Sequence, residues 1–173
     1  MGMKSWMIAV LCLAMAIGVM AQPPDDTATC AISVTVDDIM EWSANFPAIA
    51  LATMTTQAAA PTGSQSTTLY TNGNVDITAD NTDTSQLTKT TDTLVTSYSL
   101  AYDGNGVAAT GGSSVAYTLH SSFLSSASVV THVSLDGAVV VTLGARAQHD
   151  AGNVADSGDY TAIQTLTASW GTQ

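Results

Sequence analysis

Apolar and polar residues alternate along much of this chain with a period of two, as they do in β-strands that bury one face. The clearest stretch is 138–147, whose odd-numbered residues are all apolar: Val139, Val141, Leu143, Ala145 and Ala147. The stretch 129–135 alternates as well, and Asp136-Gly137 separates the two. Because Asp-Gly readily takes the positive φ angles of a type I′ turn, the pattern predicts a β-hairpin over 129–147.

Shorter stretches repeat this pattern from one end of the chain to the other. A second hairpin is predicted around Asn72-Gly73, between 66–71 and 75–79. Further strands are predicted over these ranges, with polar or glycine-containing connections between them: 29–36, 94–102, 115–119 and 161–170. No stretch has the 3.6-residue period of an amphipathic helix. The sequence therefore predicts an all-β fold, a single immunoglobulin-like Greek-key β-sandwich of about eight or nine strands.

Three tyrosines fall on faces that the alternation assigns to the core. Tyr98 and Tyr102 share a face with Leu100, and Tyr117 shares a face with Val115. Aromatic side chains are large enough to contribute much of a small core. We therefore expect all three rings to pack between the two sheets.

The N-terminal residues have the pattern of an export signal. A short positive start is followed by an apolar run over 8–20, which is too short to span a bilayer. Val19-Met20-Ala21 suits a cleavage site, so a signal peptide is predicted over 1–21. We expect a secreted or cell-surface protein with a flexible N-terminal arm over 22–28 and one sandwich domain over 29–173.

The charge of the chain narrows the choice of partners. The formal net charge is −11, with 14 acidic residues against three Lys and Arg. Beyond the predicted signal peptide, the only Lys and Arg are Lys89 and Arg146. Nucleic acid and anionic membrane surfaces need clustered basic residues, so neither is expected as a partner. A solvated surface that resists association explains the acidity, and cation binding is the alternative.

One cysteine remains once the signal peptide is removed. In the predicted strand 29–36, it lies on the same face as three apolar residues: Cys30, Ile32, Val34 and Val36. Cysteine behaves well as a small buried apolar residue, which is one interpretation. A free thiol or an intermolecular disulfide is the other, because an unpaired cysteine in an exported protein has no partner in its own chain.

These stretches resemble a group of exported bacterial sandwich proteins. The hairpin 129–147, Gly158-Asp159-Tyr160 and the strand 161–170 are similar to the C-terminal half of spore-coat-protein-U-like, fimbrial-subunit-like and WxL-related domains. Ala28-Thr29-Cys30 and the apolar segment 39–46 are similar to the front of such domains. The mature chain lacks the second cysteine that such fimbrial subunits commonly carry, and it has no Trp-x-Leu motif. The resemblance implies an exported, surface-associated structural module.

The search for catalytic motifs is negative. The chain has no Gly-x-Ser-x-Gly, no His-Glu-x-x-His, no Cys-x-x-Cys and no phosphate-binding glycine loop. We therefore expect a protein that is not an enzyme. His120 and His132 fall on the polar faces of their strands, where two solvated histidines are expected, and a joint metal site is the alternative.

One loop has the composition of a site for a hard cation. Four oxygen-bearing residues recur at three-residue steps through it: Asp150, Asn153, Asp156 and Asp159. Ca²⁺ takes several such oxygen ligands from loops. Asp and Asn are also favoured in turns, because they hydrogen-bond their own backbone. Turn chemistry and a structural calcium ion are the two interpretations, and no other cofactor is expected.

Export, the sandwich pattern and the missing catalytic motifs together favour a structural protein of the cell exterior. It would assemble with itself or with other cell-surface proteins when an N-terminal strand completes the sheet of a neighbour. The residues that would be inserted are Cys30, Ile32, Val34 and Val36. The alternative is a monomeric carbohydrate- or surface-binding module that presents Trp42 or Trp170 to a sugar.

Overall fold

The computed structural model describes residues 26–172, and the chain divides into two compact units, 1–35 and 36–173. The predicted signal peptide lies outside the described residues, as does the start of the predicted arm. In the first unit, the described residues 26–35 have no regular secondary structure and are exposed. The strand predicted over 29–36 is therefore not formed, and Ile32 and Val34 are 92% and 89% exposed.

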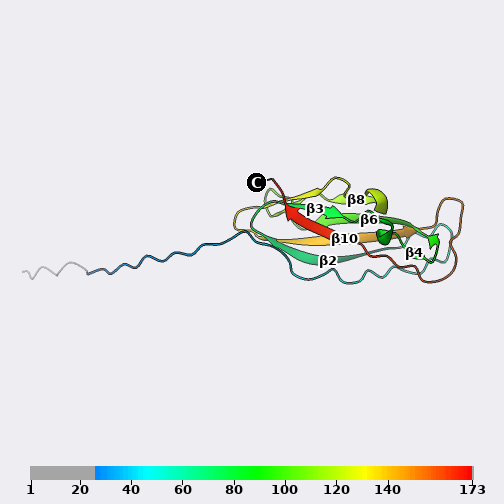
Figure 1. Cartoon of the computed structure of the whole chain (residues 1–173), viewed down its shortest axis with the longest axis horizontal. Helices are drawn as coiled ribbons and strands as arrows, with labels where there is room; N and C mark the ends of the chain where they lie inside the picture. Colours follow the sequence, from blue (N-terminus) through cyan, green and yellow to red (C-terminus); the bar gives the residue numbers. More distant parts are fainter. Residues whose placement is uncertain (1–25, 173) are drawn as a thin grey trace, which may run out of the picture. The chain divides into compact units, whose positions relative to one another are not determined.

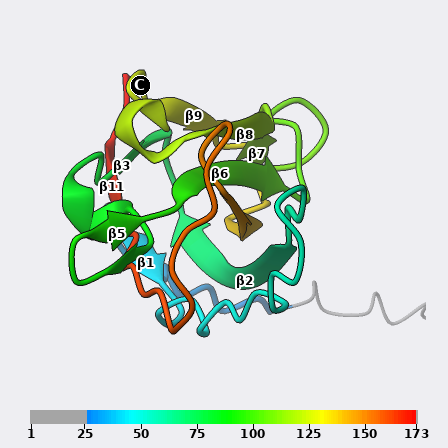
Figure 2. The ribbon, with the colours of Figure 1, turned by 90° about the vertical axis from the view of Figure 1, so that its right-hand side faces the viewer.

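The second unit is all-β and contains two antiparallel sheets (Figures 1 and 2). The five-stranded sheet has the order β1 (Met40–Trp42), β2 (Thr62–Thr71), β10 (Ala138–Gln148), β6 (Val95–Tyr102) and β8 (Val115–Leu119). The four-stranded sheet has the order β11 (Leu166–Trp170), β3 (Val75–Ala79), β9 (Ser128–Thr131) and β7 (Gly111–Gly112). This arrangement is consistent with the predicted β-sandwich.

Short elements complete the second unit. A hairpin of β4 (Thr88–Lys89) and β5 (Asp92–Thr93) stands apart from the two sheets. Two 3₁₀ turns lie at Asp83–Ser85 and His120–Ser122, and residues 26–172 contain no α-helix. Within those residues, no helix is long and apolar enough to cross a membrane.

The core lies between the inner faces of the two sheets. The alternation over 138–147 is confirmed, since its odd-numbered residues are buried and its even-numbered residues mostly are not. The other sheet contributes Val75, Ile77 and Val130, each fully buried. Phe123, from the connection after β8, is also fully buried and packs against Tyr98 with 5.6 Å between ring centroids. Burial of these apolar faces is what holds the two sheets together.

Both hairpin predictions are wrong, because each pair of strands is divided between the two sheets. β9 lies in the four-stranded sheet and β10 in the five-stranded one, and β3 and β2 are separated in the same way. Neither Asn72-Gly73 nor Asp136-Gly137 has the positive φ angles of a type I′ turn. Both dipeptides are instead corners at which the chain crosses from one sheet to the other.

Tertiary hydrogen bonds occupy the side chains at these corners. Asn72 Oδ1 accepts the Ile39 N–H at 2.8 Å, and Asp136 Oδ2 accepts the Thr110 N–H at 2.8 Å. A local Asn-Gly or Asp-Gly turn uses the same polar groups for its own backbone. The tertiary partners therefore replace the local turn that the sequence favours.

Tyr117 is the one tyrosine of the three that lies outside the core. The pairing of β6 with β8 shifts register between Tyr98 and Leu100. Residues of β8 before and after this bulge therefore do not keep one alternation of core-facing and solvent-facing side chains. Val115 packs on the core, whereas Tyr117 is exposed with the Arg146 guanidinium 5.0 Å from its ring centroid. Strict alternation cannot anticipate a bulge, and this is why the Tyr117 prediction fails.

The buried ring of Phe123 generates a first prediction. Replacing Phe123 with Ala removes a fully buried ring between the sheets, and we expect the free energy of unfolding to fall by about 3–5 kcal/mol. Urea denaturation followed by circular dichroism measures this change. Leu135→Ala is the control, because Leu135 is fully exposed and the expected change is within about 0.5 kcal/mol. Equal losses in the two variants would contradict the assigned core.

Candidate functional site

At one end of the sandwich, irregular segments cover the five-stranded sheet in place of the other sheet. There the inner residues of β6 and β10 line two cavities together with the segments 46–57 and 154–164. No residue of β3, β7, β9 or β11 lines either cavity. This end lies on the right-hand side of Figure 1, where the orange segment after β10 projects. It faces the viewer in Figure 2.

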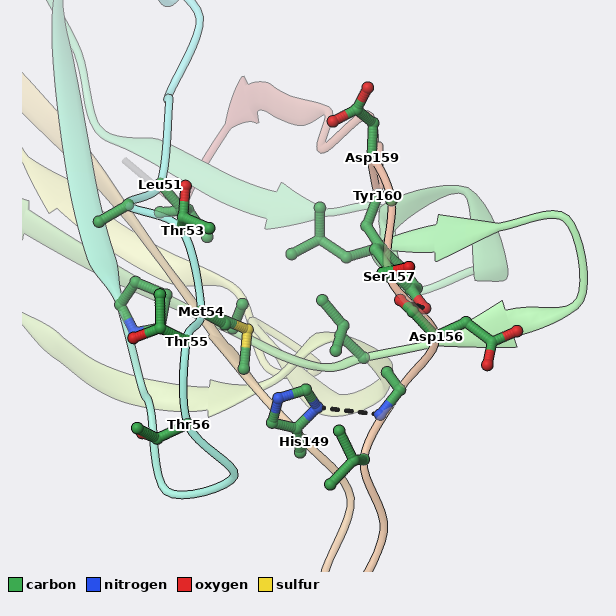
Figure 3. A pocket seen from close by; sticks show the side chains of 18 of the residues that line it. Leu51, Thr53, Met54, Thr55, Thr56, His149, Asp156, Ser157, Asp159 and Tyr160 are labelled. Carbon is green, nitrogen blue, oxygen red and sulfur yellow. Dashed lines mark hydrogen bonds between the residues drawn. The ribbon is translucent and has the colours of Figure 1, made fainter.

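The two cavities are neighbours with lining residues in common, and we call them together the end cleft. The larger has a volume of about 620 Å³ and the smaller about 290 Å³, and Ile49, Leu51 and Leu87 line both. Figure 3 shows the larger cavity, with Leu51 to Thr56 on one wall and Asp156 to Tyr160 on the other. The floor is mainly apolar and comes from Leu87, Leu94, Tyr98, Leu143, Ala145 and Ala147.

The wall formed by 154–164 is fixed by backbone hydrogen bonds. Thr88 and Thr161 exchange two of them, at 3.0 and 3.2 Å, and the Ile163 N–H donates to the Thr84 carbonyl at 2.9 Å. The Asp156 N–H donates to Asp92 Oδ2 at 2.6 Å, and Lys89 Nζ donates to the Ser157 carbonyl. The β4–β5 hairpin therefore holds this wall at several points.

Asp92 and Tyr160 form the electrostatic centre of that wall. The Tyr160 hydroxyl donates to Asp92 Oδ2 and also lies 2.9 Å from the Asp156 carbonyl oxygen. The hydroxyl, and after it the Asp156 N–H, lowers the pKa of Asp92 from its ordinary value. Desolvation, followed by the nearby Asp92 carboxylate, raises the pKa of Tyr160 to about 12. Both shifts favour the ionised Asp92 and the neutral Tyr160 that this contact needs.

The opposite wall, formed by 46–57, is held by side chains rather than by its backbone. Over residues 46–55 of this wall, no backbone hydrogen bond is made to any described residue. Phe46, Ile49 and Leu51 pack against the core. Gly63 permits this close approach, because a Cβ at that position would lie 2.9 Å from Ile49 Cγ2. One wall of the cleft is therefore anchored and the other rests on apolar contacts.

The strand beside this wall has an open edge. β1 pairs only with the last three residues of β2, from Leu69 to Thr71, and the Ser43 N–H adds one bond to the Thr68 carbonyl. β2 pairs with β10 on its other side from Thr62 to Tyr70. On the β1 side, Thr62, Ser64 and Ser66 are exposed and have no backbone partner among the described residues. An edge of this kind is a template for another strand.

The structure does not gather the four residues of the predicted calcium loop around one point. Asp150 Oδ1 accepts the Ala151 N–H at 2.8 Å and the Asp150 carbonyl accepts the Asn153 N–H at 3.0 Å, which is turn chemistry. The carboxylates of Asp156 and Asp159 point away from each other (Figure 3). Within residues 26–172, no group of three or more His, Cys, Asp or Glu is placed to hold a metal ion. Calcium binding at these residues stays a prediction.

The other predicted site residues lie in different places. Cys30 is exposed and carries a free thiol, and Ile32, Val34 and Val36 are exposed as well. Trp42 packs against Phe46 with 5.8 Å between ring centroids, whereas Trp170 is 41% exposed. His120 and His132 are half-buried rather than solvated.

Sequence reasoning missed the contact between Asp92 and Tyr160. The two residues are 68 positions apart, and although Tyr160 ends the stretch Gly158-Asp159-Tyr160, nothing in the sequence links it to Asp92. No local pattern in the sequence signals this contact. Long-range packing alone brings the elements of the end cleft together.

No protein-family model matches the chain, and no curated protein is significantly similar to it. The resemblance to exported bacterial sandwich domains therefore stays a prediction.

The contact between Asp92 and Tyr160 predicts an acid dependence of stability. The pKa of Asp92 is lower in the folded state than in the unfolded state. The ionised carboxylate therefore stabilises the fold at any pH above its unfolded pKa of about 3.9. This stabilisation is lost as the pH falls through the folded pKa. We expect Tyr160→Phe to lower the melting temperature at neutral pH and to reduce the further loss between about pH 5 and pH 2. Thermal unfolding at a series of pH values measures both effects. An unchanged acid slope in the variant would show that Tyr160 does not shift the Asp92 pKa.

Proposed function

We propose that this chain is a structural subunit of the cell exterior, an immunoglobulin-like Greek-key sandwich that assembles by strand complementation. In this proposal the segment around Cys30 to Val36 of one copy adds to a sheet of another copy. The observation that carries it is the exposure of three alternating apolar residues outside any strand, Ile32, Val34 and Val36, which are 92%, 89% and 69% exposed. Their alternation suits a strand that buries one face.

The physical argument is that this exposure is costly unless a partner removes it. Burying one Val or Ile side chain fully is worth roughly 1.5–3 kcal/mol. An added strand also pairs its backbone with an open sheet edge, so it gains main-chain hydrogen bonds while its alternate side chains enter apolar pockets. Proteins block such pairing by placing Pro or charged residues on an exposed strand. The segment from Ala28 to Val36 contains neither.

The predicted export signal supports an extracellular place for this assembly. Outside the cell, the thiol of Cys30 is in an oxidising environment, where it can join two neighbouring subunits. The negative net charge of −11 opposes non-specific association, so specific strand pairing has to supply the attraction.

A carbohydrate-binding module is the second candidate function, and the exposure of Trp170 favours it. Trp170 is 41% exposed at the end of β11, an edge strand of its sheet, where a flat ring is free to stack on a sugar. Retention on glycan or cell-wall material that disappears in Trp170→Ala would support this function. Retention that survives the change would remove its basis.

Substitutions on the apolar face of the segment test whether assembly depends on its insertion into a neighbouring copy. We expect Ile32→Asp with Val34→Asp to abolish self-assembly, because both charges would have to enter an apolar site. Negative-stain electron microscopy and light scattering on the purified exported chain measure filaments and particle size.

The matched control puts the same two charges on the other face. Ser33→Asp with Thr35→Asp adds equal charge at positions that a complementing strand turns toward solvent, so assembly should persist. Equal loss in both double variants would indicate a charge effect and not strand insertion. A chain that stays monomeric with and without reductant, before any substitution, would overturn the proposed function.

A further inference from the structure

We infer that the outer face of the five-stranded sheet binds a polysaccharide that carries carboxylate groups, and that Arg146 is the residue that pairs with them. The inference does not depend on assembly of the chain, so its success or failure is separate from that of the proposed function. It follows from the rows of side chains across four strands, the packing around Arg146 and the distribution of charge.

The outer face consists of the side chains that alternate with the core residues of β2, β10, β6 and β8, and we call it the outer platform. The ladders align these side chains in rows across the sheet. One row contains Thr62, Arg146, Ser97 and Leu119, and the next contains Ser64, Gly144 and Ser99. Neighbouring strands lie about 4.8 Å apart, so four strands make a platform roughly 14 Å wide. This width suits an extended ligand.

Arg146 and Tyr117 form the centre of the outer platform. The Arg146 guanidinium carbon lies 5.0 Å from the centroid of the Tyr117 ring. Gly144 makes room for this ring, because a Cβ at position 144 would lie 3.1 Å from the Tyr117 hydroxyl oxygen and closer still to Ser99 Oγ. Tyr117 therefore leans from β8 across β6 onto β10. The attraction between a cation and the face of an aromatic ring holds the guanidinium in place.

The hydrogen-bonding capacity of Arg146 is unused within the described part of the chain. Its Nε is buried without a hydrogen-bond partner, and no hydrogen bond or ion pair joins its guanidinium to any residue of 26–172. The side chain as a whole is only half-buried. A guanidinium presents its donors in a rigid fork that matches a carboxylate. The single arginine of a chain with 14 acidic residues thus lacks the partner that it would usually have.

The outer platform is the place where an anionic ligand meets no repulsion from close by. None of the four strands contains Asp or Glu. Asp103 follows β6, and its Oδ1 accepts the Val140 N–H at 2.8 Å. Since the net charge of the chain is −11, an anion is repelled by most of the surface and attracted to the area around Arg146.

Hydroxyl groups surround Arg146 and indicate what kind of anion fits. Ser66 Oγ and Thr142 Oγ1 are 2.8 Å apart and share a hydrogen bond. Each hydroxyl can both donate and accept, as the hydroxyls of a sugar do. Exposed hydroxyl-bearing residues continue along β2 at Thr62 and Ser64. A partner protein that needs apolar burial finds little here, whereas a chain of sugars with carboxylates finds both hydroxyls and a cation.

Removal of the charge of Arg146 tests the inference directly. The probe is an oligosaccharide of polygalacturonate, and isothermal titration calorimetry on the full-length exported chain measures its affinity. We expect Arg146→Gln to weaken binding by about tenfold or more, because a charge-assisted pair is lost. Lys89→Gln is the matched control, since it removes the same charge from β4, which is not part of this sheet. An equal loss in both variants would indicate bulk charge and would overturn the site.

The chemistry of the probe tests which group is recognised. Methyl esterification of polygalacturonate keeps the sugar chain and removes its charge, so binding should weaken by about tenfold. Equal binding of the esterified form would overturn the carboxylate as the recognised group. Free galacturonate that binds as tightly as the oligosaccharide would overturn the polysaccharide as ligand. No measurable binding by the unaltered chain would overturn the inference and leave the proposed function standing.

A charge placed at an exposed position gives a second test that does not disturb the packing of Arg146. Ser64→Glu adds a carboxylate to the outer platform and should weaken binding by about tenfold. Thr167→Glu adds the same charge at an exposed position of β11, in the other sheet, and should leave binding unchanged. Circular dichroism and melting temperature show that each variant is folded. A folded Ser64→Glu variant that binds like the unaltered chain would overturn the outer platform as the site.

Trp170→Ala separates this site from the second candidate function. Trp170 lies on β11, so its loss should leave the affinity for polygalacturonate unchanged. Loss of binding in Trp170→Ala, with Arg146→Gln unaffected, would assign the sugar to Trp170 and overturn the inference. Light scattering adds one further outcome. A dimer that Ser64→Glu dissociates, without any binding of sugar, would show that a second copy covers the outer platform and would overturn it as a polysaccharide site.

Discussion

The structure depends on the double-sided pairing of β10. This strand pairs with β2 on one side and with β6 on the other along nearly its whole length. Its inner residues Val139, Val141 and Leu143 supply the middle of the core. Because both ladders need β10 at the centre of the five-stranded sheet, β9 is left to pair within the other sheet. The crossings at Asn72-Gly73 and Asp136-Gly137 follow from this requirement.

The same constraint produces the end cleft. β10 and β6 extend beyond the end of the four-stranded sheet, and irregular segments cover their inner faces there. One of these segments gains backbone partners in the β4–β5 hairpin, whereas 46–55 has none among the described residues. Where the core ends before its longest strands do, irregular chain takes over the covering of the apolar floor, and Leu94, Tyr98, Leu143, Ala145 and Ala147 stay buried beneath it.

Acidity and strand pairing act against each other in this protein. Two basic residues, Lys89 and Arg146, lie among many carboxylates in the predicted mature chain, so copies repel one another at long range. Lys89 is already engaged with the Ser157 carbonyl, and Arg146 lies against Tyr117. Salt screens this repulsion beyond a Debye length of about 8 Å, so in the proposed function the attraction between copies comes from apolar burial and backbone pairing at short range. The uncharged segment from Ala28 to Val36 is suited to that role.

The sequence by itself determined the all-β class and most of the core, because alternation with a period of two is a local property of each strand. It identified the inner faces of β10 and β6 and the isolated apolar segment with Ile32 and Val34. Only the tertiary structure decided which strands share a sheet, where Tyr117 faces and how Asp92 meets Tyr160. Those outcomes depend on competition between strands far apart in the chain. Local turn preference at an Asn-Gly or Asp-Gly pair is weaker than two complete ladders and a shared core.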